Sequence, residues 1–223
     1  MKKIISILCL ILCFSFIFCF GCKQKNPLVD CVSELRCDIF EGKSQNFSIK
    51  CSYGFKENPY KNDALVGQKV YMLCFRLLDK ELDGATYVLS FDFNGQTYTK
   101  EFKLNPVSHA MTCEIEVDDF NLKQFPIKVS YGSITEEINL LSILPEKTID
   151  YLTALNYLYN DQKNLINAYI DKDGNFKGEI YVRVIVKNQH PYYYVGIASG
   201  ADNLKALLID GLTPKVLAIR EIF

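Results

Sequence analysis

The chain has 223 residues and a formal net charge of −1 at neutral pH. Charges of mixed sign without a concentrated basic region argue against nucleic acid as a partner. Because 49% of the residues are hydrophobic and 13% are aromatic, the chain can bury a sizeable core, and this argues against extended disorder.

The first predicted element is an export leader. Lys2 and Lys3 precede an uncharged, strongly apolar run over Ile4–Cys22. Such a run enters lipid while the lysines stay on the cytoplasmic side, so residues 1–21 are predicted to be a signal peptide. The remainder is then expected to face the extracytoplasmic side of the membrane. Since the two lysines contribute +2, that remainder carries a net charge of −3.

The end of the leader indicates how the chain is held. Cys19-Phe20-Gly21-Cys22 resembles the lipobox of bacterial lipoproteins, in which a small residue precedes a cysteine that is lipidated and becomes the new N-terminus. The resemblance implies lipidation at Cys22 and a lipid anchor in the cell membrane. An uncleaved transmembrane anchor is the alternative. Lys23-Gln24-Lys25-Asn26-Pro27 begins a polar, proline-containing segment, so residues 22–29 are predicted to be a tether.

Residues 30–145 are predicted to form an antiparallel β-sandwich. Short runs of alternating apolar and polar residues recur at the spacing expected of an all-β sandwich. The predicted strands are Glu34–Phe40, Asn46–Gly54, Lys69–Leu78, Thr86–Phe93, Gln96–Leu104, Met111–Val117, Pro126–Tyr131 and Ile134–Ile143.

Two hairpins fix the register within this region. Asn94-Gly95 is suited to a type I′ turn, which pairs Phe93 with Gln96 and Phe91 with Tyr98. A second turn at Gly132-Ser133 suits type II′ and pairs Tyr131 with Ile134, Ile127 with Ile138 and Lys128 with Glu137. The apolar members of these pairs are expected to share the buried face.

Strand alternation also places two cysteines on inward faces. Cys51 follows Phe47 and Ile49 at every second position, and Cys113 precedes Ile115 and Val117 in the same way. This resembles an immunoglobulin-like sandwich, in which facing cysteines lie on strands of opposite sheets. The resemblance implies a disulfide between Cys51 and Cys113. Cys31, Cys37 and Cys74 are the other cysteines beyond the leader, so the five form an odd number.

Pro145-Glu146-Lys147 marks a change of pattern, and residues 146–223 are predicted to form a small α+β domain. A helix is predicted to begin after Thr148 as its N-cap and to run to Tyr159, with its apolar positions at helical spacing. The tail is predicted to be mostly strands, at Leu165–Ile170, Gly178–Lys187, Tyr192–Ala198, Ala206–Ile209 and Lys215–Glu221, with a short helix or turn near Asp202–Lys205.

Part of this tail weakly resembles the PepSY-like domains of exported bacterial proteins. The segments that carry the resemblance are Tyr192–Gly196 and Ala206–Ala218. In that family a strand ending in Asp is followed by a turn with Thr-Gly and by a closing strand. Here Pro214 stands where the family has Gly. The resemblance implies an interaction domain that regulates or inhibits an exported protease, with no catalytic residues.

Several polar residues are candidates for a metal-binding or catalytic site. Asp171, Asp173, Asn175 and Glu179 have alternating oxygen side chains, but the spacing is not that of a calcium-binding EF-hand, and Asp173-Gly174-Asn175 is predicted to be a hairpin turn. His109 and His190 have no nucleophile or carboxylate at a catalytic or metal-binding spacing, so they are interpreted as surface residues.

Three consecutive tyrosines, Tyr192 to Tyr194, are the remaining candidate for ligand binding. Tyrosine offers a flat apolar face and a polar tip, which suits glycan or peptide binding, but ordinary packing within a sheet explains the run as well. Alternation places Tyr193 on the face opposite to Tyr192 and Tyr194.

The sequence therefore predicts a mainly β, membrane-anchored extracytoplasmic protein that acts as a binding or structural module of the bacterial cell envelope. A protein or glycan is the expected type of ligand. A protease regulator is the alternative. No cofactor, metal site or catalytic residue is predicted, so an enzymatic role is not expected.

Overall fold

The computed structural model describes residues 26–58, 67–78, 86–106, 108–199 and 204–222. The helices are α2 (Pro27–Asp30), α3 (Tyr151–Asp161) and α4 (Lys163–Asn167). The first nine strands are β1 (Val32–Lys43), β2 (Ser48–Asn58), β3 (Gln68–Leu78), β4 (Tyr87–Phe93), β5 (Gln96–Glu101), β6 (Lys103–Asn105), β7 (Ala110–Glu116), β8 (Gln124–Tyr131) and β9 (Ile134–Ser142). The last four are β10 (Glu179–Lys187), β11 (His190–Ala198), β12 (Leu204–Asp210) and β13 (Val216–Ile222).

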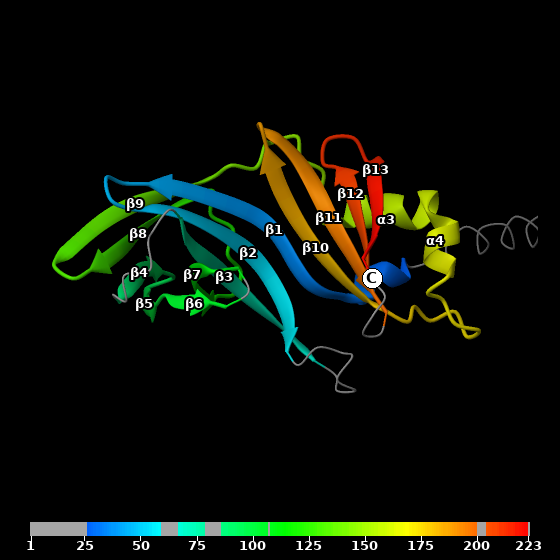
Figure 1. Cartoon of the computed structure of the whole chain (residues 1–223), viewed down its shortest axis with the longest axis horizontal. Helices are drawn as coiled ribbons and strands as arrows, with labels where there is room; N and C mark the ends of the chain where they lie inside the picture. The colour runs from blue at the N-terminus through cyan, green and yellow to red at the C-terminus, as the bar shows by residue number, and fades with distance from the viewer. Residues whose placement is uncertain (1–25, 59–66, 79–85, 107, 200–203, 223) are drawn as a thin grey trace, which may run out of the picture.

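The fold is mainly β, as predicted: an antiparallel sandwich is followed by an α+β part (Figure 1). One continuous series of paired strands runs in the order β13-β12-β11-β10-β1-β2-β3-β7-β6. A branch of strands in the order β9-β8-β4-β5 leaves this series at β1 and forms the second layer of the sandwich.

Strand β1 joins the two parts. Along one edge it pairs with β2 over most of its length. Along the other edge its first half pairs in parallel with β10, and its second half pairs with β9 at Phe40 and Glu41. The predicted boundary at Pro145 falls in the connection between β9 and α3.

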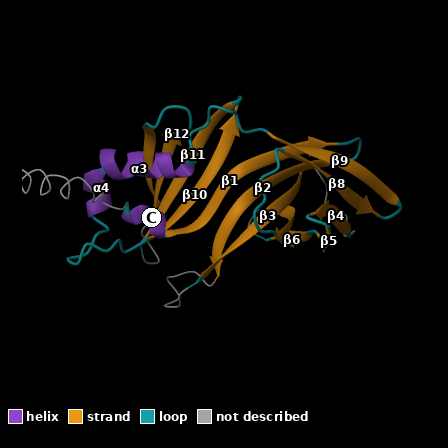
Figure 2. Ribbon diagram, turned by 180° about the vertical axis from the view of Figure 1, so that it is seen from behind, coloured by secondary structure: helices purple, strands orange, loops and turns teal. Residues whose placement is uncertain are grey.

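Two hydrophobic clusters lie on the same face of the long sheet, except that Ile39 of the second cluster is paired with Ser52 on the other face. The first fills the sandwich and is rich in aromatic rings, such as Phe40, Phe75 and Phe125. The second lies between the helices and strands β1 and β10–β12 (Figure 2). The boundary between the two clusters falls on strand β2. Tyr53 belongs to the first cluster, and Phe55, two positions further on the same face, belongs to the second.

The hairpin predictions are confirmed. Asn94 and Gly95 have φ angles of 51° and 75°, and the pairs of Phe93 with Gln96 and Phe91 with Tyr98 are present. The second hairpin has the predicted register, with Lys128 opposite Glu137. One detail is wrong, because Ile134 is exposed beside the turn.

The helical region differs from its prediction in two places. The N-cap of α3 is Asp150, whose carboxylate accepts from the Thr153 N–H at 2.6 Å, whereas the Thr148 hydroxyl donates to the Pro145 carbonyl. The strand predicted at Leu165–Ile170 is also wrong, because α4 covers its first half. The helical turn buries Ile166 completely in the second cluster, and an apolar run this short does not distinguish helix from strand.

The predicted tether at residues 22–29 is wrong from Asn26 onward. Asn26 caps α2 through its side chain, which accepts from the Leu28 N–H at 2.9 Å and donates to Asn156 on α3 at 3.0 Å. Leu28 is fully buried in the second cluster. The polar composition of this segment hid a short helix, which Pro27 at its first turn favours.

Candidate functional site

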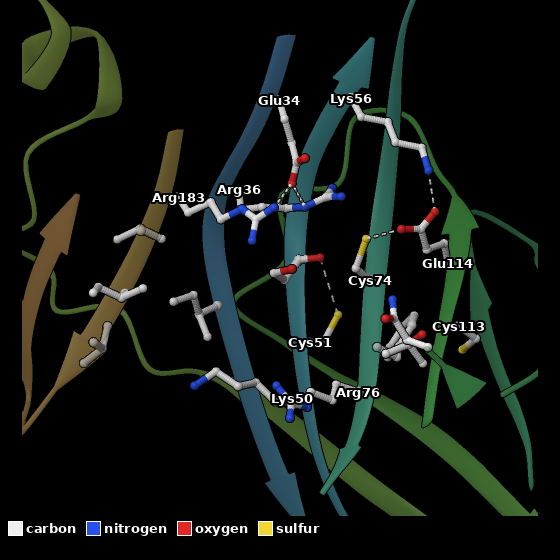
Figure 3. A pocket seen from close by; sticks show the side chains of 18 residues that line it. Glu34, Arg36, Lys50, Cys51, Lys56, Cys74, Arg76, Cys113, Glu114 and Arg183 are labelled. Carbon is white, nitrogen blue, oxygen red and sulfur yellow. Dashed lines mark hydrogen bonds and ion pairs between the residues drawn. The ribbon is translucent and has the colours of Figure 1, made fainter. Parts of the chain in front are cut away.

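A groove of about 550 Å³ lies on the face of the long sheet opposite to the two clusters. Its lining comes from β10, β1, β2, β3, β7 and β6 (Figure 3). We call it the sheet groove. The lining residues are Glu34, Arg36, Ile39, Lys50, Cys51, Ser52, Lys56, Cys74, Phe75, Arg76, Asn105, Thr112, Cys113, Glu114, Arg183, Val184, Ile185 and Val186.

The hollow follows from the sizes of the outward side chains. Strand alternation on β2 and β3 brings the small residues Ser52 and Cys74, which are paired with each other, to this face. Long cationic side chains occupy positions two further along, such as Lys50 on β2 and Arg76 on β3, which are paired with each other. Short side chains in the middle and long ones at the ends leave a depression with a charged rim.

The rim is strongly positive. Five lining residues are cationic and two are acidic, so the groove carries an excess of three positive charges. The whole chain has a net charge of −1, so the remainder has an excess of four negative charges. The positive charge is therefore concentrated in the groove and is not a property of the surface in general.

At one end of the groove a carboxylate joins two guanidinium groups. Glu34 Oε1 lies 3.3 Å from Arg36 Nε and 3.0 Å from Arg183 Nη2. The side chains of Glu34 and Arg36 are only 10% and 11% exposed, whereas that of Arg183 is 56% exposed. Because one carboxylate serves two cations, this end retains a positive charge.

Arg36 owes its position to Gly54. Arg36 is paired with Gly54 on β2, and Gly54 is paired with Met72 on β3. Since Gly54 has no side chain, the guanidinium extends across β2, where its Nη2 donates weakly to the sulfur of Met72 at 3.9 Å. Arg36 Nη1 is buried and has no hydrogen-bond partner among the described residues. A buried donor without a partner costs about 1–3 kcal/mol.

The other charges differ in how far they are neutralised. Lys56 Nζ lies 2.6 Å from Glu114, and Lys50 Nζ lies 2.9 Å from Glu41. Burial raises the pKa of Glu114, but the hydrogen bond and charge of Lys56 outweigh it, so the pKa lies below its ordinary value and the carboxyl is ionised. Arg76 is exposed and makes no ion pair within the described part of the chain.

Cys74, the outward-facing cysteine of the groove lining, is a weak nucleophile. Cys74 is a free thiol that donates to Glu114 at 3.6 Å. Burial raises its pKa to about 12, against the lowering effect of Arg36. Since thiolate is the reactive form, Cys74 contributes packing and a weak polar contact and is protonated at neutral pH.

The predicted disulfide between Cys51 and Cys113 is wrong. Both are free thiols, on β2 and β7 of the same layer, and both are paired with Phe75 on the intervening strand β3. Two strand spacings amount to about 9.6 Å, which exceeds the Cα separation that a disulfide tolerates. Alternation placed both thiols inward correctly, but it could not show which strand lies between them. Cys37 is a free thiol as well.

The tyrosine run has the alternation that the sequence predicted. Tyr193 points into the second cluster, where its hydroxyl donates to the Ile149 carbonyl at 2.6 Å. Burial raises the pKa of Tyr193 well above its ordinary value, so the hydroxyl stays a donor. Tyr192 and Tyr194 are partly exposed on the opposite face, the same face as Ile185 and Arg183 with which they pair.

The remaining candidate residues lie away from the groove lining. His190 Nε2 is 3.0 Å from Asp210 at the end of β11 and β12, and His109 occupies a turn with a φ of 49°. Asp171 accepts from the backbone N–H groups of Asp173 and Asn175, and Lys177 neutralises it at 2.9 Å. A turn is present here as predicted, but it closes only an isolated bridge between Ile170 and Phe176, so the prediction of a hairpin between two strands is wrong.

Cys22 lies outside the described residues. Within the described ranges, no helix has the length and apolar character needed to cross a membrane. Comparisons of the chain with protein-family models, with curated proteins and with solved structures gave no match.

Sequence reasoning missed the groove itself. The predicted inward face of Cys51 implies by alternation that Lys50 and Ser52 face outward, but no face was assigned to Cys74 and Arg76 in the predicted strand Lys69–Leu78. What the strand predictions could not supply is the order β10-β1-β2-β3-β7, which brings outward residues from five separate segments to one surface.

Proposed function

We propose that this protein is a membrane-anchored, extracytoplasmic binding module of the bacterial cell envelope, and that the sheet groove binds an anionic ligand. The lipobox-like Cys19-Phe20-Gly21-Cys22 and the apolar run before it support the location. Asn26, only four residues beyond Cys22, already caps α2, and Leu28 of this helix is fully buried. On this proposal the module is held close to the membrane surface.

The observation that carries the binding function is the groove, with its excess of three positive charges on a chain whose net charge is negative. Concentrated charge of one sign in a hollow raises the local concentration of oppositely charged ligands. Arg76 and Arg183 are exposed, so cationic groups are available along the groove, and the buried Arg36 Nη1 has no hydrogen-bond partner among the described residues.

Binding of model polyanions tests this function. Fluorescent oligogalacturonate and polyglutamate of equal charge would be titrated with the protein, with neutral dextran as the negative control. We expect at least one polyanion to bind, with an affinity that falls as salt is added, because exposed charges are screened. Lack of binding by both polyanions would overturn the proposed ligand class.

Paired variants locate the binding. We expect Arg76→Gln combined with Arg183→Gln to lower the affinity at least tenfold. The matched control is Lys128→Gln combined with Lys123→Gln, which removes the same charge from residues outside the groove lining. An equal loss in both pairs would show that net charge, and not the groove, attracts the polyanion.

The location has its own test. Intact mass of the protein made in a lipoprotein-processing bacterium should show loss of residues 1–21 and acylation at Cys22, and the protein should fractionate with membranes. Recovery of the full-length chain in the cytosol would contradict the proposed location and leave the groove measurement unaffected.

A further inference from the structure

The face that carries the sheet groove continues without a break onto β11. Arg36 on β1 is paired with Arg183 on β10, and Arg183 is paired with Tyr194 on β11. Side chains at paired positions of neighbouring strands lie on the same face. Arg36, Arg183 and Tyr194 therefore form a row across three strands, which we call the cross-strand row. Its length is about 10 Å, or two strand spacings.

Tyr194 is not needed to complete either hydrophobic cluster. It is partly exposed, and in the described ranges its hydroxyl has no hydrogen-bond partner. Tyr192 lies two positions away on the same face and packs against His190 at 4.7 Å between ring centroids. The inward Tyr193 is the member of the run that fills the core. The outer face thus presents two aromatic rings next to the positive end of the groove.

A tyrosine ring beside an arginine favours some anionic ligands over others. A tyrosine ring offers a flat apolar surface with a polar edge, and arginine binds a carboxylate through two parallel hydrogen bonds. Arg183 and Tyr194 occupy paired positions on adjacent strands, whose backbones are about 5 Å apart. A matching ligand carries a flat C–H surface and a carboxylate on one small unit. An acidic sugar ring has both features, whereas an acidic peptide side chain has the carboxylate without the ring.

On the basis of the proposed function, we infer that the ligand of the sheet groove is an acidic oligosaccharide. One sugar ring packs on Tyr194, and its carboxylate binds Arg183 beside Arg36. Further acidic sugars extend along the groove toward Arg76 at its other end. Arg76 is paired with Lys50, which lies four residues along β2 from Gly54, the partner of Arg36. The two ends are therefore about 13 Å apart, and the groove is long enough for more than one sugar.

Three probes separate this inference from the proposed function. The full-length protein purified in detergent would be titrated with three probes: oligogalacturonate, its neutral methyl ester, and polyglutamate with the same charge as the oligogalacturonate. We expect oligogalacturonate to bind at least ten times more tightly than the other two. Equal affinity for oligogalacturonate and polyglutamate would overturn the sugar assignment and leave the anion-binding function standing. If no polyanion binds, the proposed function fails as well.

Variants of the outer tyrosine provide the second arm. We expect Tyr194→Ala to lower the affinity for oligogalacturonate about tenfold and to change the affinity for polyglutamate less than twofold, because the ring contacts only a sugar. Tyr194→Leu keeps apolar volume without the flat ring and should show the same selective loss. Tyr157→Ala on α3 is the control and should change neither affinity. Equal loss for both polyanions in the Tyr194 variants would overturn the inference.

Discussion

Asp210 shows how much local order a single carboxylate can supply. Its Oδ1 accepts from the N–H groups of Thr213 and Leu212 at 2.9 and 2.8 Å, and its Oδ2 contacts His190. These contacts fix the turn between β12 and β13 and connect it to β11. The bond from the Thr213 N–H, followed by those from Leu212 and His190, lowers the pKa of Asp210 to about 2 despite some desolvation.

This depressed pKa predicts a pH dependence of stability. A carboxyl with a folded pKa below its unfolded value stabilises the fold above about pH 4, and the contribution disappears as the pH falls through about 2. We therefore expect Asp210→Asn to lower the melting temperature at pH 7, and the difference from the wild type to shrink between pH 4 and pH 2. Thermal unfolding by circular dichroism measures this.

Asp118→Asn is the control for that series. Asp118 is exposed and has no hydrogen bond or ion pair within the described part of the chain, so its substitution should not alter the melting temperature at any pH. A deficit of Asp210→Asn that stays constant from pH 7 to pH 2 would contradict the electrostatic explanation.

At the scale of elements, the close approach of β1 to its antiparallel neighbour β2 depends on Gly54. The register between these strands shifts between Arg36 and Asp38, so β1 has an irregularity beside Gly54. A Cβ at Gly54 would lie 1.8 Å from the carbonyl oxygen of Leu35. This close approach accompanies the burial of Leu35 in the second cluster, while Arg36 reaches across β2 toward Met72.

Gly54→Ala is therefore expected to destabilise the protein by about 3 kcal/mol, because the obstacle is backbone and cannot rotate away. The free energy of unfolding in urea measures the loss. Gly196→Ala is the matched control, since its nearest neighbours would be 3.6 Å away, and it should be neutral or stabilise by up to about 1 kcal/mol. Equal changes in the free energy of unfolding for the two variants would contradict the role assigned to the close approach of β1 and β2 at Gly54.

At the scale of the whole molecule, the two hydrophobic clusters do not follow the order of the chain. The second cluster takes Leu28 from α2, Val32 and Leu35 from β1 and Phe55 from β2, although its helices and other strands follow Pro145. Strand β10 also obtains its parallel partner from β1. The segment after Pro145 therefore lacks part of its own core.

We expect the isolated segment 148–223 to be unfolded, and the chain from residue 26 to unfold cooperatively. Without α2, β1 and β2, the faces of β10 and α3 stay exposed to water, and this is unfavourable for apolar surface. Circular dichroism and urea titration of both chains measure this. A cooperative transition in the isolated segment would contradict the expectation and would make a separate protease-regulating domain testable by itself.

Local patterns in the sequence were sufficient for much of this fold. Alternation gave the faces of Cys51, Cys113 and Tyr193, and the turn residues Asn94-Gly95 fixed the register of a hairpin, because period and turn geometry are short-range properties. The buried helix at Pro27–Asp30 was mistaken for a tether, because a segment of four residues has no measurable period.

Only the tertiary structure decided which strands are neighbours. The rejection of the Cys51 and Cys113 disulfide, and the meeting of Arg36, Arg183 and Arg76 on one surface, both depend on the order of the strands. Pairing between segments more than a hundred residues apart, such as β1 with β10, depends on burial of a shared core. Apolar contacts are non-directional, so the amino-acid sequence alone determined the faces of the strands and left their partners open.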